Sequence, residues 1–177
     1  MISNLVHIER VTPQIALVRM KREDKLNALN DELIEGLTEA AETLREDAAV
    51  KVVVVTGGMR AFSAGADIGT FDAIGKELDV NRVRRATQRG VRMAELWESL
   101  PAITIAAVEG GAVGGGFGLA LACDWRVFAR NAYGYVPEVQ LGLNYGFDNA
   151  ALAALVGPVF DKIAGSLVDA FVKRAGQ

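Results

Sequence analysis

Hydrophobic and polar residues alternate in two short segments near the start of the chain. These segments, LVHIERV (5–11) and IALVRM (15–20), flank Thr12, Pro13 and Gln14. Alternation with a period of two is typical of strands with one buried face, and a break that contains proline favours a turn. The sequence therefore predicts a β-hairpin over residues 5–20.

Helical spacing follows the hairpin. Leucine and alanine recur every three or four positions from Asn30, which is a suitable N-cap residue, to Arg45. The next segment, KVVVVTGG (51–58), is a continuous apolar run closed by glycines. Such a run is typical of a strand buried on both faces of a sheet. The order of strand, helix and buried strand predicts a crossover connection and a sheet flanked by helices.

The second half of the chain repeats these patterns. Residues 80–100 have helical periodicity that ends at Pro101, and AITIAAV (102–108) is a second apolar strand. Short strands are predicted at WRVFA (125–129) and YGYV (133–136), and helices are predicted after residue 150. The last helix has one apolar stripe, formed by Phe160, Ile163, Leu167 and Phe171.

The composition limits the classes of function. The chain has 177 residues, of which 51% are hydrophobic and 23% charged, as is typical of one globular domain. The formal net charge of −3 gives no overall basic field, so neither nucleic acid nor a membrane is an expected partner. The first residues are unlike a signal peptide, and no apolar run approaches the ~18 residues that span a bilayer. We therefore expect a cytoplasmic protein.

Cysteine and histidine each occur once. Cys123 excludes an internal disulfide framework and is expected to be a small buried residue. His7 lies in a strand-like segment far from the glycine-rich motifs, and no zinc site can be built from these two residues alone. No metal ligand is predicted.

Glycines follow two of the predicted strands. In VVVVTGGMRAFSAGAD (52–67) and ITIAAVEGGAVGGGFG (103–118), a buried strand runs into residues with almost no side chain. Exposed amide groups at such junctions form a concave site for an anion or a developing oxyanion. The spacings of dinucleotide and P-loop motifs are absent. Tight packing of a helix on a strand is the alternative explanation for the glycines.

Three ordered motifs carry a resemblance to a known family. FSAGADI (62–68), AVEGGAVGGGFGLALACD (107–124) and VPEVQLGL (136–143) resemble the crotonase superfamily of enoyl-CoA hydratases and isomerases. KLNALN (25–30) is similar to the early coenzyme A loop of that family. The resemblance implies an α/β crotonase-like spiral of ββα units with helices packed on the sheets. It implies one domain over 1–177, with a core at 5–158 and a divergent helical segment at 159–177.

The resemblance also implies an enzyme that acts on acyl-CoA thioesters. In the family pattern, two backbone N–H groups bind the thioester oxygen, and the matching residues here are Ala66 and Gly115. Preorganised donors of this kind stabilise a developing enolate. Glu138 matches the residue that transfers the proton. The family uses no catalytic cofactor, and coenzyme A is part of the substrate.

Coenzyme A contacts are implied for two segments of the chain. The matching residues are Lys25, Ala28, Ala64, Ala66, Asp67 and Ile68. The family's usual Asn-Arg-Pro before the first loop is replaced by Met20, Lys21 and Arg22. Independently of the resemblance, Asp67 is equally suited to be a helix N-cap.

Gly118 is the departure that bears most on the reaction. Hydratases of the family place a first glutamate at this position and pair it with the second, which corresponds to Glu138. One carboxylate is enough to take a proton from one carbon and return it to another. The sequence therefore favours an isomerase-like reaction. A hydratase, lyase or thioester hydrolase of the same family, or a catalytically silent homologue that binds acyl-CoA or a protein, are the alternatives.

Two further departures affect substrate and assembly. Tyr145, Phe147, Asp148 and Asn149 replace glycine-rich family residues, either near the acyl pocket or in a capping turn. The family's later helices close over coenzyme A and build a trimer, whereas this sequence stops at Gln177 with a dissimilar helix. A homotrimer or hexamer is expected from the resemblance alone. Arginines at 82, 85, 89 and 92 form a stripe on one face of the helix predicted at 80–100. This stripe is expected to face solvent or another subunit, with binding of coenzyme phosphates as an alternative and binding of RNA as a weaker one.

Overall fold

The computed structural model describes residues 3–67, 69 and 80–137, all within a compact unit that ends at Glu138. Strands β1 (Val6–Thr12) and β2 (Ile15–Met20) pair antiparallel. This confirms the predicted hairpin. The sequence signal suffices here because an alternating pattern and a turn are both local features, although burial alternates regularly only in β2.

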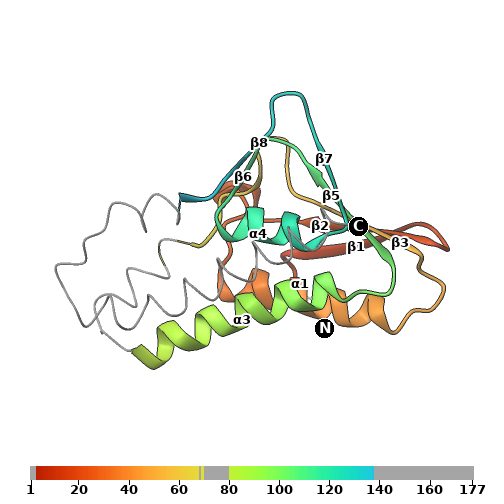
Figure 1. The fold of residues 1–177 in the computed structure, drawn as a ribbon, viewed down its shortest axis with the longest axis horizontal. Coiled ribbons are helices and arrows are strands. Elements are labelled where there is room, and N and C mark those ends of the chain that lie inside the picture. Colours follow the sequence, from red (N-terminus) through yellow and green to blue (C-terminus); the bar gives the residue numbers. More distant parts are fainter. Residues whose placement is uncertain (1–2, 68, 70–79, 138–177) are drawn as a thin grey trace, which may run out of the picture. The chain divides into compact units, whose positions relative to one another are not determined.

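Two sheets organise the unit (Figure 1). The larger sheet has the strand order β1-β2-β3-β5-β7, and every pairing after the hairpin is parallel. Its later strands are β3 (Val52–Thr56), β5 (Ile103–Val108) and β7 (Trp125–Phe128). The smaller sheet is parallel throughout and contains β4 (Ala61–Ser63), β6 (Gly111–Val113) and β8 (Tyr133–Tyr135).

The chain passes between the two sheets in a repeating order. Each of the pairs β3/β4, β5/β6 and β7/β8 adds one strand to the large sheet and the next to the small one. Helix α3 (Val80–Glu98) follows the first pair, and α4 (Gly115–Ala122) follows the second. This is the predicted spiral of ββα units. Strands β4 and β6 were not predicted, because a strand of three residues is too short to show a measurable periodicity.

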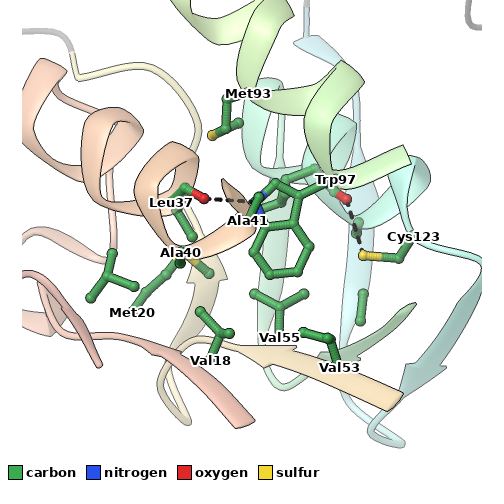
Figure 2. Close-up of a cluster of buried hydrophobic side chains, with 14 of the residues drawn as sticks. Val18, Met20, Leu37, Ala40, Ala41, Val53, Val55, Met93, Trp97 and Cys123 are labelled. Carbon is green, nitrogen blue, oxygen red and sulfur yellow. Dashed lines mark hydrogen bonds between the residues drawn. The ribbon is translucent and has the colours of Figure 1, made fainter. Parts of the chain in front are cut away.

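Helices α1 (Asp31–Arg45) and α3 lie side by side below one face of the large sheet (Figure 1). The Asn30 side chain accepts a hydrogen bond from the Leu33 N–H, which confirms the predicted N-cap. Figure 2 shows the resulting core, where residues of α1 and α3 meet the inward residues of β2 and β3. Its fully buried members include Val18, Met20, Leu37, Val53, Val55 and Trp97.

The opposite face of the large sheet is less covered than predicted. Val52 and Val54 of β3 are only partly buried, and Ile103 of β5 is 52% exposed. The prediction that these strands are buried on both faces is therefore wrong. A continuous apolar run does not distinguish full burial from a hydrophobic surface, because both present the same residue types.

Arginines of α3 form ion pairs with α1. Arg89 pairs with Asp31 at 2.7 Å, and Arg92 pairs with Glu42 at 3.0 Å. Two members of the predicted arginine stripe thus connect neighbouring helices of one unit. Such exposed pairs contribute little to stability, about 0–1 kcal/mol each.

Several predictions concern single features. Cys123 is fully buried at the end of α4, as predicted. In the part of the chain that the structure describes, no helix has the length and apolar character to cross a membrane, and no group of metal-ligating side chains occurs. The helices predicted after residue 150, with the stripe from Phe160 to Phe171, lie outside the described residues.

Candidate active site

Both glycine-rich junctions lie at the same edge of the small sheet. Strands β4 and β6 are parallel neighbours, with Ala61 opposite Gly111 and Ser63 opposite Ala112. Their carboxyl ends therefore meet, and the chain leaves them through Ala64 and Gly114. Ligand sites commonly occur at the carboxyl ends of parallel strands. The predicted association of the two junctions has its structural basis in this pairing.

The two junctions touch through their main chains. Gly65 has a φ of +85°, and a Cβ at this position would lie 2.7 Å from the carbonyl oxygen of Val113. A Cβ on Gly116 would lie 2.5 Å from the Cβ of Ser63. Both glycines are therefore required by close approach, and Gly65 also by its left-handed conformation. Tight packing and a ligand site were alternative explanations, and the structure shows the tight packing directly.

The amides of Ala66 and Gly115 have no hydrogen-bond partner within the part of the chain that the structure describes. Both residues are exposed. The carbonyl of Gly65 accepts from the Leu29 N–H at 2.7 Å. Because a peptide group is planar and trans, the Ala66 N–H of the same peptide points away from Leu29. Gly115 is the first residue of α4, where the amides have no partner within the helix.

The loop predicted to contact coenzyme A runs beside the first junction. The Ala64 N–H donates to the Leu26 carbonyl at 2.9 Å, and the Asp67 N–H donates to the Leu29 carbonyl at 3.2 Å. The structure therefore brings the segments that contain Lys25, Ala28, Ala64, Ala66 and Asp67 together. Lys25 is exposed at the end of a 3-10 turn, and Ala28 is partly buried.

Two predicted site residues lie outside the described residues. These are Ile68, in the coenzyme A segment, and Glu138, the predicted acid and base. The same holds for Tyr145, Phe147, Asp148 and Asn149. Gly118, which the resemblance matches to the first glutamate of a hydratase, lies within α4, and a Cβ there would meet nothing within 4 Å.

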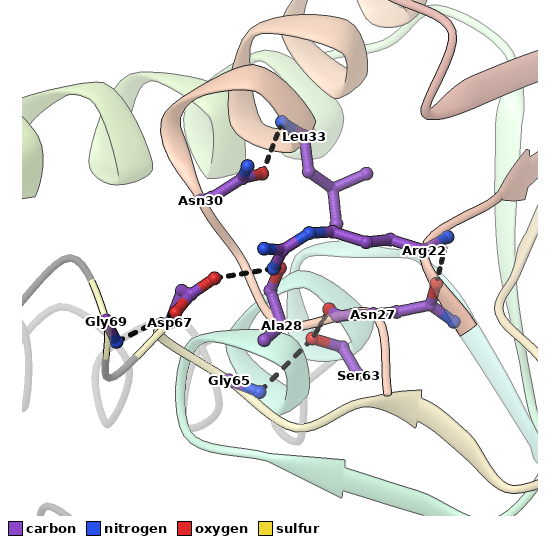
Figure 3. Close-up of polar contacts among 9 residues, drawn as sticks. All are labelled: Arg22, Asn27, Ala28, Asn30, Leu33, Ser63, Gly65, Asp67 and Gly69. Carbon is purple, nitrogen blue, oxygen red and sulfur yellow. Dashed lines mark hydrogen bonds and ion pairs between the residues drawn. The ribbon is translucent and has the colours of Figure 1, made fainter. Parts of the chain in front are cut away.

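Arg22 is a polar residue of the site that sequence analysis did not identify. Figure 3 shows its guanidinium between two acceptors. Its Nη1 donates to the Ala28 carbonyl at 2.8 Å and pairs with Asp67 Oδ2 at 2.6 Å. Asp67 Oδ1 accepts from the Gly69 N–H at 2.9 Å. The hydrogen bond from Arg22 is the main reason that the pKa of Asp67 lies below its ordinary value. The hydrogen bond from the Gly69 N–H lowers this pKa further, and burial partly opposes both.

The Arg22–Asp67 pair predicts a pH-dependent contribution to stability. A depressed pKa means that the pair stabilises the fold above the unfolded pKa of about 3.9 and loses this effect as pH falls through the lower folded pKa. We expect Asp67→Asn to lower the free energy of unfolding by about 1–2 kcal/mol near neutral pH. Urea unfolding of both proteins should show this difference shrinking below about pH 4.

The exposed Arg92–Glu42 pair supplies a control for that measurement. Its side chains are 70% and 48% exposed, against 16% and 20% for Arg22 and Asp67. Glu42→Gln should change the free energy of unfolding by less than about 0.5 kcal/mol. An Asp67→Asn difference of the same size in acid as at neutral pH would contradict the role given to the charge.

Comparison with known proteins gives one matching family model and several similar proteins. Residues 10–158 match the family model for enoyl-CoA hydratase/isomerase. A crotonyl-CoA hydratase from Syntrophomonas wolfei is 37% identical over 147 residues, which cover 82% of this chain and 55% of the relative. A short-chain-enoyl-CoA hydratase from Clostridium acetobutylicum is 36% identical over 146 residues, covering 81% of this chain and 54% of the relative.

Solved structures share the fold as well as the sequence. The crystal structure of an enoyl-CoA hydratase from Bacillus anthracis superposes with a TM-score of 0.72 at 34% identity. The superposition covers 78% of this chain and 52% of that one. The chain thus spans about half the length of each of these three relatives. The spiral of ββα units, the paired glycine junctions and these matches together show that the chain belongs to the enoyl-CoA hydratase/isomerase family.

Proposed function

We propose that this chain binds an acyl-CoA thioester and stabilises its enolate. The observation that carries the proposal is the pair of N–H groups of Ala66 and Gly115, two exposed residues on junctions in main-chain contact. Two such donors aimed at a developing oxyanion contribute up to about 3–4 kcal/mol each. The dipole of α4 adds positive potential beside the Gly115 amide.

We assign the binding of the coenzyme A part of the substrate to the two segments beside these amides. Lys25, Ala28, Ala64, Asp67 and Ile68 contribute, by main chain and side chain, to a surface for the nucleotide and pantetheine. Lys25 is exposed and cationic beside this surface, which suits a phosphate. No catalytic cofactor takes part in the proposed reaction. A homotrimer or hexamer is the proposed assembly, and light scattering of the purified protein measures it.

An isomerase reaction suits the single carboxylate. Glu138 takes the proton from C2 of a 3-enoyl-CoA, and the electron pair of that bond moves into the thioester carbonyl. The two amides stabilise the resulting dienolate. The proton then returns at C4 and the double bond moves to C2–C3. Hydration would need a group that holds the attacking water, and Gly118 has no carboxylate to help do so.

Hydration is the second candidate, and the names of relatives favour it. The matched proteins from Syntrophomonas wolfei and Clostridium acetobutylicum are both hydratases by name. Hydration removes the ultraviolet absorbance of a 2-enoyl-CoA, whereas isomerisation of a 3-enoyl-CoA creates it. A faster loss than gain of this absorbance would show that hydration is the main reaction. A catalytically silent homologue would bind acyl-CoA without changing either substrate.

The test combines binding and turnover in the purified chain. We expect calorimetry to detect acyl-CoA binding and ultraviolet absorbance to report 2-enoyl thioester formed from a 3-enoyl-CoA. Glu138→Gln should lower turnover at least about 100-fold, because general acid–base catalysis contributes roughly 10²–10⁴-fold. Its affinity for coenzyme A should stay within about twofold, since the change leaves the other groups of the site in place.

Glu109 offers a matched control for Glu138→Gln. It is an exposed carboxylate in the connection between β5 and β6, at the far end of β6 from Gly114. Glu109→Gln should therefore leave turnover within about twofold of the original protein. Equal activity of Glu138→Gln and the unaltered chain would refute the role of Glu138 while leaving the acyl-CoA site standing.

A further inference from the structure

Two buried polar side chains connect the loop before α1 to β4 and to the junction that contains Ala66. Asn27 and Ser63 are both fully buried (0% exposed). Ser63 Oγ donates to the main-chain carbonyl of Asn27 at 2.8 Å and accepts from the Gly65 N–H at 3.2 Å (Figure 3). One hydroxyl therefore ties the first loop to the junction that carries the candidate oxyanion donor.

Asn27 fixes the loop from the other side. It has a φ of 51°, in the left-handed region. Its Oδ1 accepts from the Arg22 N–H at 2.8 Å, and its Nδ2 donates to the Ala61 carbonyl at 3.3 Å. A buried amide side chain that is satisfied on both sides locks the loop geometry that it spans. Asn27 thus connects the end of the hairpin to β4.

These contacts fix two successive peptide planes. The N–H of Gly65 is held by Ser63, and its carbonyl is held by the Leu29 N–H at 2.7 Å. The Gly65 carbonyl and the Ala66 N–H belong to the same rigid peptide group. Gly65 has no Cβ, so its backbone can adopt many conformations, and the observed φ of +85° persists because both peptide planes are anchored. The direction of the Ala66 N–H thus depends on the groups that hold the two peptide planes of Gly65.

We infer that Ser63 and Asn27 are positioning residues, which aim the Ala66 N–H at the thioester oxygen. This inference rests on the proposed function, because it assigns the Ala66 amide to an oxyanion. Both side chains are fully buried, so we assign them no direct contact with substrate. Their effect is expected on the transition state, where the alignment of a donor counts most.

The kinetic test uses Ser63→Ala and Ser63→Cys. We expect Ser63→Ala to lower kcat about tenfold with KM and coenzyme A affinity within about twofold, since small misplacements of a donor act mainly on the transition state. Ser63→Cys retains a weak donor of similar size, so part of the loss should be recovered. An infrared spectrum of a bound acyl-CoA should show a higher carbonyl stretching frequency in Ser63→Ala than in the unaltered protein.

Thr38 provides the matched control for a purely structural effect. Its hydroxyl also donates to a main-chain carbonyl at 2.8 Å, that of Ile34, within α1. Thr38→Ala removes the same kind of hydrogen bond without contact to either junction. It should leave kcat and the carbonyl frequency unchanged. Equal kinetic effects of Thr38→Ala and Ser63→Ala would overturn the positioning role.

A measurement without substrate separates this inference from the proposed function. In ¹⁵N–¹H spectra of the ligand-free protein, Ser63→Ala should shift the amide signals of Gly65 and Ala66. The amide signal of Gly90, in α3, should not shift. If the unaltered chain neither binds nor converts acyl-CoA, the proposed function fails, whereas these shifts still show what orients the amide. Unshifted Gly65 and Ala66 signals would overturn the inference even in an active enzyme.

Discussion

An alanine at position 65 is expected to lower the free energy of unfolding by about 2–4 kcal/mol and to reduce acyl-CoA turnover at least about 100-fold. The φ of +85° is strained for any residue with a side chain, and the new methyl group would meet the Val113 carbonyl oxygen at 2.7 Å. Relief of that contact requires the two junctions to separate. Separation alters the distance between the Ala66 and Gly115 amides, so stability and turnover fall together.

Gly90→Ala is the matched control, because it makes the same substitution at a position with room for a Cβ. Gly90 lies within α3, and a Cβ there would meet nothing within 4 Å. Gly90→Ala should raise the free energy of unfolding by about 0.5–1 kcal/mol, because alanine favours the helix. Urea unfolding and turnover of both variants make the comparison. A stable and fully active Gly65→Ala protein would show that main-chain contact between the junctions is dispensable.

Loss of the Trp97 side chain is expected to have the largest effect on folding. Trp97 is fully buried, and its Nε1 donates to the Leu37 carbonyl at 3.1 Å (Figure 2). It fills the space between α3, α1 and the inward valines of β3. Trp97→Ala leaves a cavity there and should lower the free energy of unfolding by about 3–5 kcal/mol. Thermal and urea unfolding followed by circular dichroism measure the loss.

Trp125 is the only other tryptophan in the chain and gives the matched control. It is 67% exposed on β7, at the edge of the large sheet. Trp125→Ala should change the free energy of unfolding by less than about 1 kcal/mol. Its remaining fluorescence then comes from Trp97 and should have the short emission wavelength of a buried indole. Similar losses of stability for the two variants would contradict the assigned core.

Elements with a long, regular pattern were predictable from the sequence. The hairpin of β1 and β2 and the helix capped by Asn30 appear where the pattern places them. In each case the deciding interactions lie within one element or between neighbours in sequence. The continuous apolar strands were also placed correctly, but the exposure of Ile103 was not, since residue type alone does not specify which face of a sheet is covered.

The side-chain contacts around the candidate site were not predictable in the same way. Arg22 and Asp67 are 45 positions apart, and Asn27 and Ser63 are 36 apart. Nothing in the local sequence around Arg22 distinguishes an ion-paired arginine from a solvated one. The only local signal near Asn27 was the KLNALN motif, which indicated a ligand loop rather than a buried anchor. Such pairs depend on strand order, which single-residue patterns do not encode.

The use of main-chain amides has a consequence for inheritance. A codon change cannot delete a peptide N–H unless it introduces proline. Ala66 and Gly115, which carry the proposed donors, are therefore shielded from most single mutations in their chemistry. The vulnerable genetic targets are their neighbours, since Gly65 and Gly116 have no room for a Cβ. Natural variation should accordingly be tolerated at the exposed Ala66 and be selected against at Gly65 and Gly116, even though these two glycines carry no reactive group.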